Sequence, residues 1–498
     1  MVTIKKLLRN VNVCQIEGSI NENTLTHPIL TDAESYEGAL LYIISKTGTQ
    51  ELDIDCSKFT SLPYAIVTSE TQKMLNCHVP IIRVDSPRLA FSHACSNMYD
   101  IDYKRMKIIA ITGSNGKTTT ATLIHQILSD AGYRTGFIGT GKISIGKNIE
   151  SSDKYSMTTP DPTLLYSALS KMQDAKCEYV VMEVSSHSIA LEKISPIEFE
   201  YAIFTNLSAE HLDFHKSMDA YFSTKLKLFS KTNSALFNLD DKYSSMAYES
   251  VDCKKTAIGI IHSAPVYATE IDMRGFEGTS FFYRENDLIC RVETRLPGAF
   301  NIYNVMLALR CTKDLGVKLC ISKRSIERIS CISGRMQAYH SDITALIDYA
   351  HTPFALYNCL NFLFSVKKRK QKLIVVFGCG GNRDKSKRAP MGRIASSYAD
   401  MIIITSDNNR TEPFADIASD IEDGISDTPY NIIENREEAI SSAIINASPG
   451  DIVAIIGKGC EQYINSGDKI LCSCDYDLVK NAMNKRELYY ESKVRYTD

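Results

Sequence analysis

Short apolar runs recur along the chain, and polar or glycine-rich residues follow each of them. Such runs are typical of strands that are buried on both faces of a parallel sheet. In the middle of the chain the clearest runs cover residues 107–110, 179–184 and 201–205. Residues 122–131 have apolar side chains at helical spacing, and Gly132 provides a stop. We therefore predict a parallel sheet with helical crossovers in this part of the chain.

A second alternation of this kind begins at about residue 335, with expected strands at residues 345–349, 373–378, 401–405 and 452–457. The N-terminal part instead indicates a small mixed domain, with expected strands at residues 38–44, 65–67 and 80–84 and no catalytic constellation. We therefore predict an α/β protein of three domains. They are an N-terminal mixed α/β domain (residues 1–104), a central P-loop ATPase-like parallel sheet (residues 105–334) and a C-terminal Rossmann-like α/β domain (residues 335–498).

Composition is consistent with a large cytoplasmic protein. At 498 residues the chain is too long for one core, and its formal net charge of -3 argues against a general nucleic-acid-binding protein. No apolar run approaches the roughly 20 residues that span a bilayer, and no apolar stretch follows the basic residues of the N-terminus, so we expect neither a membrane segment nor a signal peptide. The 15 cysteines are scattered without a Cys-x-x-Cys pair and are expected to be reduced thiols.

The most informative stretch lies between the first apolar run of the central domain and the helix after it. A glycine-rich turn at this place points backbone N–H groups at anionic oxygens, which the helix dipole also favours. Lys117 is placed to reach distal phosphates, and Thr118 to offer a hydroxyl to Mg²⁺. The usual loop has a further glycine where this chain has Ile111, so the loop is a short variant. We predict nucleotide binding by Gly113, Ser114, Asn115, Gly116, Lys117, Thr118 and Thr119.

Polar residues follow two later strands of the same predicted sheet. Glu183 lies at the end of one apolar run, and Asn206 and His211 follow the next. Ligands of open α/β sheets bind beyond the carboxyl ends of the strands. These three side chains are therefore expected to converge with Lys117.

Taken in order, these and further motifs resemble those of the Mur ligases, and most closely the type that adds the third residue of the peptidoglycan stem peptide. The resemblance extends from about residue 107 to the end of the chain. Its motifs fall at residues 112–119, 158–160, 183–187, 205–207, 211–213, 225, 301–304, 334–336, 348–353, 378–388, 406–410 and 457–459.

The resemblance implies an ATP-dependent acid–amino-acid ligase of peptidoglycan precursor synthesis. In that reaction ATP phosphorylates the D-glutamyl carboxylate of UDP-N-acetylmuramoyl-L-alanyl-D-glutamate, and the amine of a diamino acid displaces the phosphate. Catalytic roles are implied for Lys117, Glu183, His211 and Lys225. Two Mg²⁺ ions are implied, with Thr118, Glu183, His211 and a Lys225 carbamylated by CO₂ as their ligands. From the residues alone, the helical pattern around Lys225 places that side chain on an exposed surface.

The resemblance also implies contacts to the two nucleotide substrates. Beyond the loop, ATP contacts are implied for Asn301, Asn304, Arg335, Asp348 and His351, although a helix-cap role is an alternative for the two asparagines. Contacts to the UDP-muramoyl-dipeptide are implied for Thr158, Thr159, Ser185 and Lys193.

The chain departs from the family pattern at three places on the side of the UDP-linked substrate. Lys193 stands where the family usually has arginine. A lysine keeps the positive charge but cannot form the bidentate hydrogen bonds of a guanidinium. Leu191 replaces a glutamine found in some members. In the N-terminal domain Thr31-Asp32-Ala33 replaces Asp-Ser-Arg, so the uridine contacts of this UDP-binding type of domain cannot be transferred.

The C-terminal motifs bear on the amino acid that is added. Members that add meso-diaminopimelate usually carry Asp-Asn-Pro-Arg, whose arginine pairs with the distal carboxylate. This chain keeps Arg410 and has Asn409 in place of the proline. The resemblance therefore implies meso-diaminopimelate, with L-lysine as the alternative. The implied amino-acid contacts are Arg388, Asp407, Asn408, Asn409, Arg410, Gly457 and Glu461.

Three other functions are weighed against this ligase. A folylpolyglutamate synthase shares the loop and the modified lysine, but the motifs at residues 158–160, 183–187 and 407–410 speak against it. A P-loop NTPase that acts as a switch would not require the C-terminal motifs. A degenerate relative without ligase activity remains open because of the changes at Asp32, Ala33 and Lys193. We expect a monomer that acts on small molecules, without nucleic-acid or membrane partners.

Overall fold

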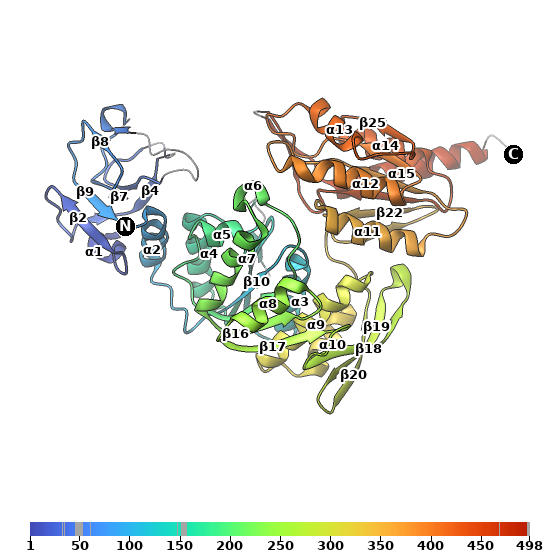
Figure 1. Cartoon of the computed structure of the whole chain (residues 1–498), viewed down its shortest axis with the longest axis horizontal. Helices are drawn as coiled ribbons and strands as arrows, with labels where there is room; N and C mark the ends of the chain where they lie inside the picture. Colours follow the sequence, from blue (N-terminus) through green and yellow to red (C-terminus); the bar gives the residue numbers. More distant parts are fainter. Residues whose placement is uncertain are drawn as a thin grey trace.

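The computed structural model describes residues 1–31, 33, 35–44, 53–59, 61–146, 148–150, 157–467 and 469–495. Figure 1 shows three bodies that follow one another along the chain, with the two termini in the outer bodies. No helix in these described ranges is long and apolar enough to cross a membrane. The three bodies are built around sheets of five, eleven and six strands.

The N-terminal sheet has the strand order β2-β9-β7-β5-β4, in which only the β2–β9 pair is antiparallel. One of its faces packs against α1 and α2, and α2 also packs against α4 (Pro162–Asp174) of the central body. The elements are β1 (Val2–Thr3), α1 (Ile4–Leu7), β2 (Val13–Glu17), β3 (Leu25–Thr26), β4 (Pro28–Leu30), β5 (Leu40–Tyr42), β6 (Ile54–Asp55), η1 (Cys56–Lys58), β7 (Ala65–Ser69), β8 (Met74–Leu75), β9 (Ile81–Val84) and α2 (Pro87–Tyr99).

The central sheet has the order β13-β12-β11-β14-β10-β15-β16-β17-β18-β19-β20. Strands β11 to β18 in this order are parallel, and antiparallel strands extend both edges. The strands are β10 (Lys107–Thr112), β11 (Thr135–Gly139), β12 (Lys142–Ile145), β13 (Asn148–Glu150), β14 (Tyr179–Glu183), β15 (Phe199–Phe204), β16 (Thr232–Asn238), β17 (Lys254–Gly259), β18 (Val266–Met273), β19 (Thr279–Glu285) and β20 (Leu288–Thr294).

Helices cover both faces of the central sheet, which explains its uninterrupted apolar runs. In β10, Ile108 and Ala110 face one apolar cluster, whereas Ile109 and Ile111 face the other. The first cluster includes α4 and α7, and the second includes α3 and α9. The helical elements are α3 (Lys117–Asp130), α4 (Pro162–Asp174), α5 (Ser186–Ala190), α6 (Leu212–His215), α7 (Met218–Leu226), η2 (Lys227–Lys231), α8 (Lys242–Ser250), η3 (Gly275–Glu277), α9 (Ala299–Asp314) and α10 (Leu319–Arg328).

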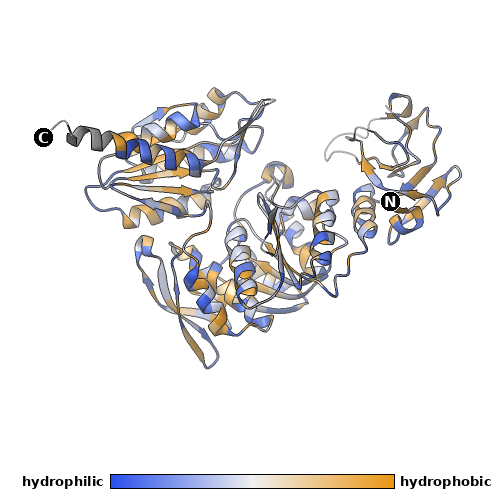
Figure 2. Ribbon diagram, turned by 180° about the vertical axis from the view of Figure 1, so that it is seen from behind, coloured by the Kyte–Doolittle hydropathy of each residue, from blue (hydrophilic) through white to orange (hydrophobic). Residues whose placement is uncertain are grey.

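The C-terminal sheet has the order β21-β22-β26-β23-β24-β25 and is parallel except for the β21 edge. Figure 2 shows its hydrophobic strands between helices of mixed polarity, as expected for a two-faced core. The elements are β21 (Gln337–His340), β22 (Thr344–Asp348), α11 (Pro353–Val366), β23 (Leu373–Phe377), η4 (Lys385–Lys387), α12 (Arg388–Tyr398), β24 (Met401–Ile404), α13 (Phe414–Glu422), β25 (Tyr430–Ile432), α14 (Arg436–Asn446), β26 (Ile452–Ile456), β27 (Tyr463–Ser466), β28 (Lys469–Cys472) and α15 (Asp475–Arg495).

Helix α7 begins at a side-chain cap. The Oγ atom of Ser217 accepts a hydrogen bond of 3.1 Å from the backbone N–H of Ala220. We expect Ser217→Ala to lower the free energy of unfolding by about 1 kcal/mol, because a backbone donor of the first turn loses its partner. Urea denaturation measures this loss, with Ser217→Asp as the matched variant that retains a capping oxygen. Equal destabilisation by both substitutions would contradict the cap assignment.

Candidate active site

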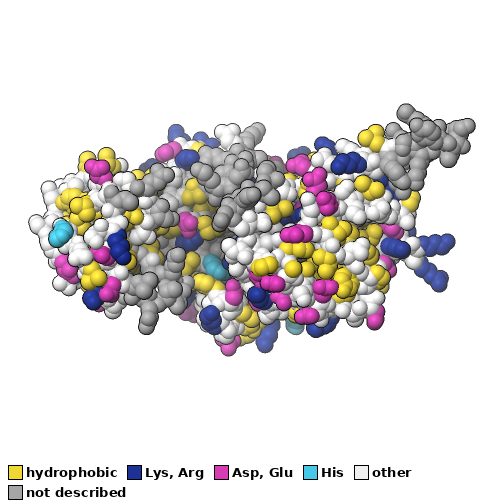
Figure 3. Space-filling view, turned by 90° about the horizontal axis from the view of Figure 1, so that it is seen from above, with side chains coloured by type: hydrophobic (Ala, Val, Ile, Leu, Met, Phe, Trp, Pro, Cys, Tyr) yellow, Lys and Arg dark blue, Asp and Glu magenta, His cyan; other side chains and the backbone are white. Residues whose placement is uncertain are grey.

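A cavity of about 1230 Å³ lies between the central and C-terminal bodies. Residues from the loop before α3, the ends of β14 and β15, helix α9 and the loops of the C-terminal sheet line it. Seen from above, charged and histidine side chains gather around a hollow near the middle of the molecule (Figure 3). The carboxyl ends of two parallel sheets thus face one space, the arrangement in which ligands bind to open α/β sheets.

The glycine-rich loop at residues 113–119 is packed closely enough to require its glycines. Gly113 has φ +143°, and a Cβ atom there would lie 2.0 Å from Oγ1 of Thr205. Gly116 has φ +85°, and a Cβ atom would lie 2.4 Å from Oδ1 of Asn304 on α9. Helix α3 begins directly after Gly116, five residues earlier than the sequence pattern predicts. Its first residues line the cavity, and the free N–H groups of the first turn therefore open into it.

The ammonium group of Lys117 folds back onto this loop. Its Nζ atom donates to the carbonyl oxygens of Gly113 at 2.9 Å and Ser114 at 2.7 Å. Burial lowers the pKa of Lys117, and the nearby carboxylates of Glu210 and Glu183 oppose that shift. The cation therefore lies at the place where a phosphate chain would cross the loop.

Oxygen atoms gather at the end of β14. The buried carboxylate of Glu183 accepts from Oγ1 of Thr118 at 3.0 Å, and from the N–H and Oγ1 of Thr140 at 3.1 and 3.3 Å. Nη2 of Arg335 donates to Oγ1 of Thr118 at 2.9 Å, so the first residues of the C-terminal body contact this group. A carboxylate and two hydroxyls are hard oxygen ligands of the kind that Mg²⁺ prefers.

A second carboxylate, that of Glu210, joins two histidines across the cavity. Its Oε1 atom lies 3.3 Å from Nε2 of His211 and 3.0 Å from Nε2 of His351. Burial lowers the pKa of His211 to about 4, against the opposing effect of Glu210. The imidazole of His211 is therefore neutral at pH 7 and has a lone pair available for a metal ion. Glu210 was not predicted, although an acidic residue directly before a site histidine is a usable sequence feature.

Lys225 lies inside the protein and not on its surface. It is 1% exposed, and its Nζ atom contacts Oγ1 of Thr112 and the carbonyl oxygen of Gly113, both at 3.2 Å. The ring of Tyr221, one turn earlier on α7, has its centroid 4.9 Å from Nζ. Within the described part of the chain no carboxylate forms an ion pair with Lys225. Burial, together with the charge of Lys117, holds the pKa of this amine well below its ordinary value.

Residues of α9 and β22 form the side of the cavity toward the C-terminal body. Asn301 donates to the carbonyl oxygen of Pro297 at 2.7 Å, and Asn304 donates to Oδ1 of Asn301 at 2.9 Å. The carboxylate of Asp348 accepts the backbone N–H groups of Met336 at 2.7 Å and Ala350 at 2.8 Å, which fixes the turn after β22. Burial raises the pKa of Asp348.

The expected contacts of the UDP-linked substrate line the opposite side of the cavity. They are Thr158, Thr159, Ser185 and Lys193. Oγ1 of Thr159 bridges the carbonyl oxygen of Glu183 and the N–H of Ser185, both at 3.0 Å. Nζ of Lys193 lies 2.5 Å from Oδ1 of Asp161. Leu191 also lines this side.

The loop after β24 meets the loop after β26. Asn408 donates to Oε2 of Glu461 at 2.9 Å, and its own Oδ1 atom accepts the N–H of Asn465 at 2.9 Å. The buried Lys458 adds an ion pair of 3.1 Å to the same carboxylate of Glu461. Arg410 has φ +53° and donates to the carbonyl oxygen of Gly381 at 2.8 Å. Asp407, Asn408, Arg410, Gly457 and Glu461 all line the cavity.

Two of the expected amino-acid contacts lie outside the cavity lining. Arg388 is fully buried, and its guanidinium pairs with Glu412 and Asp420, each at 2.8 Å. Asn409 is also buried, and its amide donates to Oγ of Ser406 at 3.1 Å. These two side chains support the loops and do not face the space between the bodies.

Two models of known protein families match this chain, and the matched residues lie mainly in the two bodies that form this cavity. Residues 111–312 match the Mur ligase middle domain, and residues 334–459 match the Mur ligase, glutamate ligase domain. A UDP-N-acetylmuramoyl-L-alanyl-D-glutamate--2,6-diaminopimelate ligase of Caldanaerobacter subterraneus subsp. tengcongensis is 38% identical over 414 residues, 82% of this chain and 84% of that protein. The chain belongs to the Mur ligase family.

Other comparisons cover between 84% and 96% of this Mur ligase. The protein of the same name from Bacillus velezensis is 33% identical over 491 residues, 96% of this chain and 98% of that one. A solved structure of a 2,6-diaminopimelate ligase of this kind superimposes with a TM-score of 0.58 at 30% identity, covering 85% of this chain and 87% of that chain. MurF from Acinetobacter baumannii shares the fold, with a TM-score of 0.59 at 16% identity and 84% of each chain covered. The predicted family and α/β fold are confirmed.

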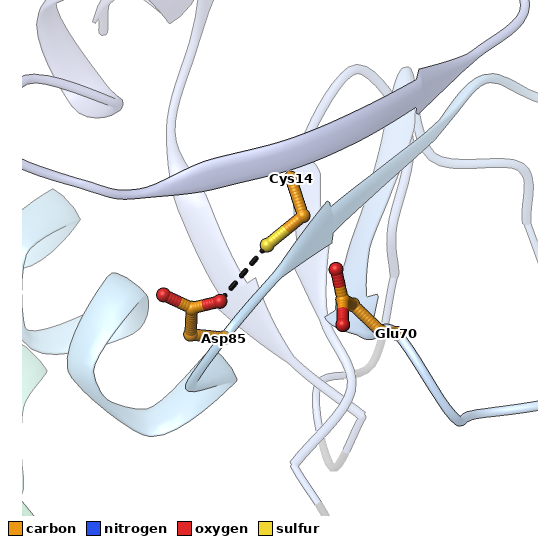
Figure 4. A group of neighbouring side chains, drawn as sticks. All are labelled: Cys14, Glu70 and Asp85. Carbon is orange, nitrogen blue, oxygen red and sulfur yellow. Dashed lines mark hydrogen bonds between the residues drawn. The ribbon is translucent and has the colours of Figure 1, made fainter.

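The N-terminal body of this Mur ligase has a separate group of ligating side chains. Cys14 in β2 and the residues directly after β7 and β9, Glu70 and Asp85, lie close together and are exposed (Figure 4). The Sγ atom of Cys14 donates to Oδ1 of Asp85 at 3.0 Å, and this bond, with desolvation and the carboxylate charges, raises the pKa of the thiol to about 12. The thiol is therefore protonated at pH 7, and the group is a hydrogen-bonded surface cluster. Asp32, one of the residues that departs from the family pattern, lies outside the described residues.

Proposed function

We propose that this Mur ligase uses ATP to join meso-diaminopimelate to the D-glutamyl carboxylate of UDP-N-acetylmuramoyl-L-alanyl-D-glutamate through an acyl phosphate. The observation that carries the proposal is that Lys117, Glu183 and Arg410 line one cavity although they belong to two different bodies. A phosphate-binding loop and a cation for a carboxylate substrate thus face the same space. The identity to relatives named as 2,6-diaminopimelate ligases supports the choice of substrates.

In this proposal the loop from Gly113 to Thr119 binds the phosphates of ATP, and Lys117 neutralises their charge. Asn301, Asn304, Arg335, Asp348 and His351 surround the remainder of the nucleotide. Mg²⁺, when bound, neutralises charge on the transferred phosphoryl group. Thr118 and Glu183 offer oxygen ligands for one ion, and the neutral imidazole of His211 offers a nitrogen for a second.

The surroundings of Lys225 fit a carbamate. A neutral amine adds to CO₂ with loss of one proton, giving an anionic N-carboxylate, and burial lowers the pKa of Lys225, which favours the neutral amine. Thr112 and Tyr221 hold the nitrogen beside the loop. The carbamate would provide an anionic oxygen ligand for Mg²⁺ at this position without any new residue.

The remaining assignments concern the other substrates and the assembly. Arg410 is proposed to pair with the distal carboxylate of meso-diaminopimelate, with Asp407, Asn408 and Glu461 fixing its loop. The domain boundaries near residues 104 and 334, the binding of UDP by the N-terminal domain and a monomeric state belong to the same proposal. Thr158, Thr159, Ser185 and Lys193 are its contacts to the UDP-muramoyl-dipeptide.

Phosphate release from ATP tests the whole proposal. With UDP-N-acetylmuramoyl-L-alanyl-D-glutamate and Mg²⁺ present, we expect release that depends on added meso-diaminopimelate, and none when L-lysine replaces it. Lys117→Ala is the matched control, since it removes the cation of the phosphate loop. Release with L-lysine alone would favour the lysine-adding alternative. Release without any acceptor would favour an NTPase, and no release in any mixture would indicate a relative without ligase activity.

A further inference from the structure

The sulfur atoms of Cys56 and Cys77 lie 2.7 Å apart in the N-terminal body. A disulfide bond is about 2.05 Å long, so the atoms need to approach by only a fraction of an ångström to become bonded. Both residues are free thiols in the structure. We propose that Cys56 and Cys77 are a modification site, a thiol pair that closes reversibly to an intramolecular disulfide. Neither residue lines the cavity, so the proposal stands apart from the ligase reaction.

The backbone around the two cysteines is already held in place. Strands β6 and β8 pair in parallel, and the N–H of Ile54 donates to the carbonyl oxygen of Lys73 at 3.0 Å. The amide of Asn76 donates to Oδ1 of Asp55 at 2.9 Å, immediately beside the sulfur atoms. Closing the bond therefore needs side-chain adjustment and little movement of the main chain. Strain in the main chain is the usual reason why a pair of cysteines fails to close.

The two thiols have different surroundings, which assigns them different roles. Cys56 is buried in an apolar cluster with Leu41 and Ile66, whereas Cys77 is half-buried. The S–H of Cys56 donates to Sγ of Cys77, and of the two sulfurs the half-buried Cys77 is the one that an external reagent can reach. Burial and this bond raise the pKa of Cys56 to about 12. Cys77 is thus the sulfur that attacks an oxidant, and Cys56 is the sulfur that resolves the intermediate.

The chemistry requires a low-molecular-weight disulfide such as oxidised glutathione. The thiolate of Cys77 attacks one sulfur of this disulfide, whose S–S bond breaks with departure of one thiolate. Cys56 then loses its proton, and its sulfur attacks that of Cys77 and releases the second thiolate. Two thiols of the protein are oxidised to one disulfide, and the external disulfide is reduced to two thiols.

The bond would join two segments that cover one face of the N-terminal sheet. Cys56 and Cys77 enclose a chain segment that includes β7, a central strand of that sheet. A cross-link of this kind restricts the open states of the enclosed segment. We expect proteolysis between residues 53 and 79 to be about tenfold slower in the oxidised protein, because cleavage requires local opening.

The test uses the full chain treated with either oxidised glutathione or dithiothreitol, followed by alkylation and peptide mapping without reduction. We expect a linked peptide pair that contains Cys56 and Cys77 and that dithiothreitol separates. Cys56→Ser is expected to accumulate a mixed disulfide at Cys77, and Cys77→Ser to leave Cys56 unmodified. Cys14→Ser is the matched control and should close the pair like the unaltered protein.

Two results would overturn the proposal. One is that Cys56 and Cys77 both remain open to alkylation after oxidation while the exposed Cys320 forms a mixed disulfide. The other is that either cysteine is found linked to a different cysteine of the chain. Because the readout is peptide mapping and not activity, failure of this proposal is distinguishable from failure of the proposed ligase reaction.

Discussion

Replacing Lys225 by alanine is expected to lower the rate of ligation by about a thousandfold, the scale of losing one charge-stabilising group in an active site. The side chain is buried beside the phosphate loop, where an alanine leaves no donor for a metal ion. A short carboxylate such as acetate is expected to restore part of the activity, because it can occupy the vacated space as an oxygen ligand. Initial rates with and without acetate measure both effects.

Two variants separate the carbamate from other roles of Lys225. Lys227→Ala removes an exposed lysine at the end of the same helix and should leave the rate unchanged. Lys225→Arg keeps a positive charge but cannot form the carbamate, and we expect it to be as inactive as the alanine variant. Full activity of Lys225→Arg would show that a cation suffices and would refute the carbamate.

Replacing Arg410 by alanine is expected to reduce kcat/KM for meso-diaminopimelate by about a hundredfold, the scale of losing two hydrogen bonds to a charged group. The guanidinium lines the cavity and is held by main-chain oxygens of Gly381 and Asn408, at 2.8 and 3.2 Å. The main effect should be on KM, because the lost contacts bind the distal carboxylate away from the reacting amine.

L-Lysine provides the contrast for this variant, since it has no distal carboxylate. Any slow reaction with L-lysine should be the same in Arg410→Ala and in the unaltered protein. Arg393→Ala, on the exposed face of α12, is the matched arginine control. An Arg410→Ala enzyme with unchanged KM for meso-diaminopimelate would remove Arg410 from the amino-acid site.

The strands around the site are predictable from sequence because both faces of the parallel sheets are covered. Strand β10, for example, is a continuous apolar run whose alternate residues meet different helices. The antiparallel extension β18–β20 was not predicted, since it is partly exposed and its polar and apolar residues mix. Some of its apolar side chains, such as Ile271 and Ile289, face solvent, whereas others, such as Phe281, are buried, so the extension provides no continuous run of the buried type.

At the site, too, the sequence alone does not predict the position of every side chain. Lys225 could be found only through the family resemblance, because burial of one lysine depends on β10 and the loop after it, more than 100 residues earlier. The family resemblance implies a substrate contact for Arg388. In the structure its guanidinium instead points toward Glu412 and Asp420, which lie 24 and 32 residues later in the chain. Local sequence specifies which chemical groups are present, whereas their orientation depends on partners brought in by the fold.

The hydroxyl of Thr118 links the proposed metal site to the contact between the two bodies. It donates to Glu183 and accepts from Arg335, at the start of the C-terminal body. A Mg²⁺ ion held by this oxygen would lie beside the guanidinium of Arg335, and repulsion between the two positive charges would weaken that contact. The position of the C-terminal body relative to the phosphate loop would then depend on whether the metal is bound.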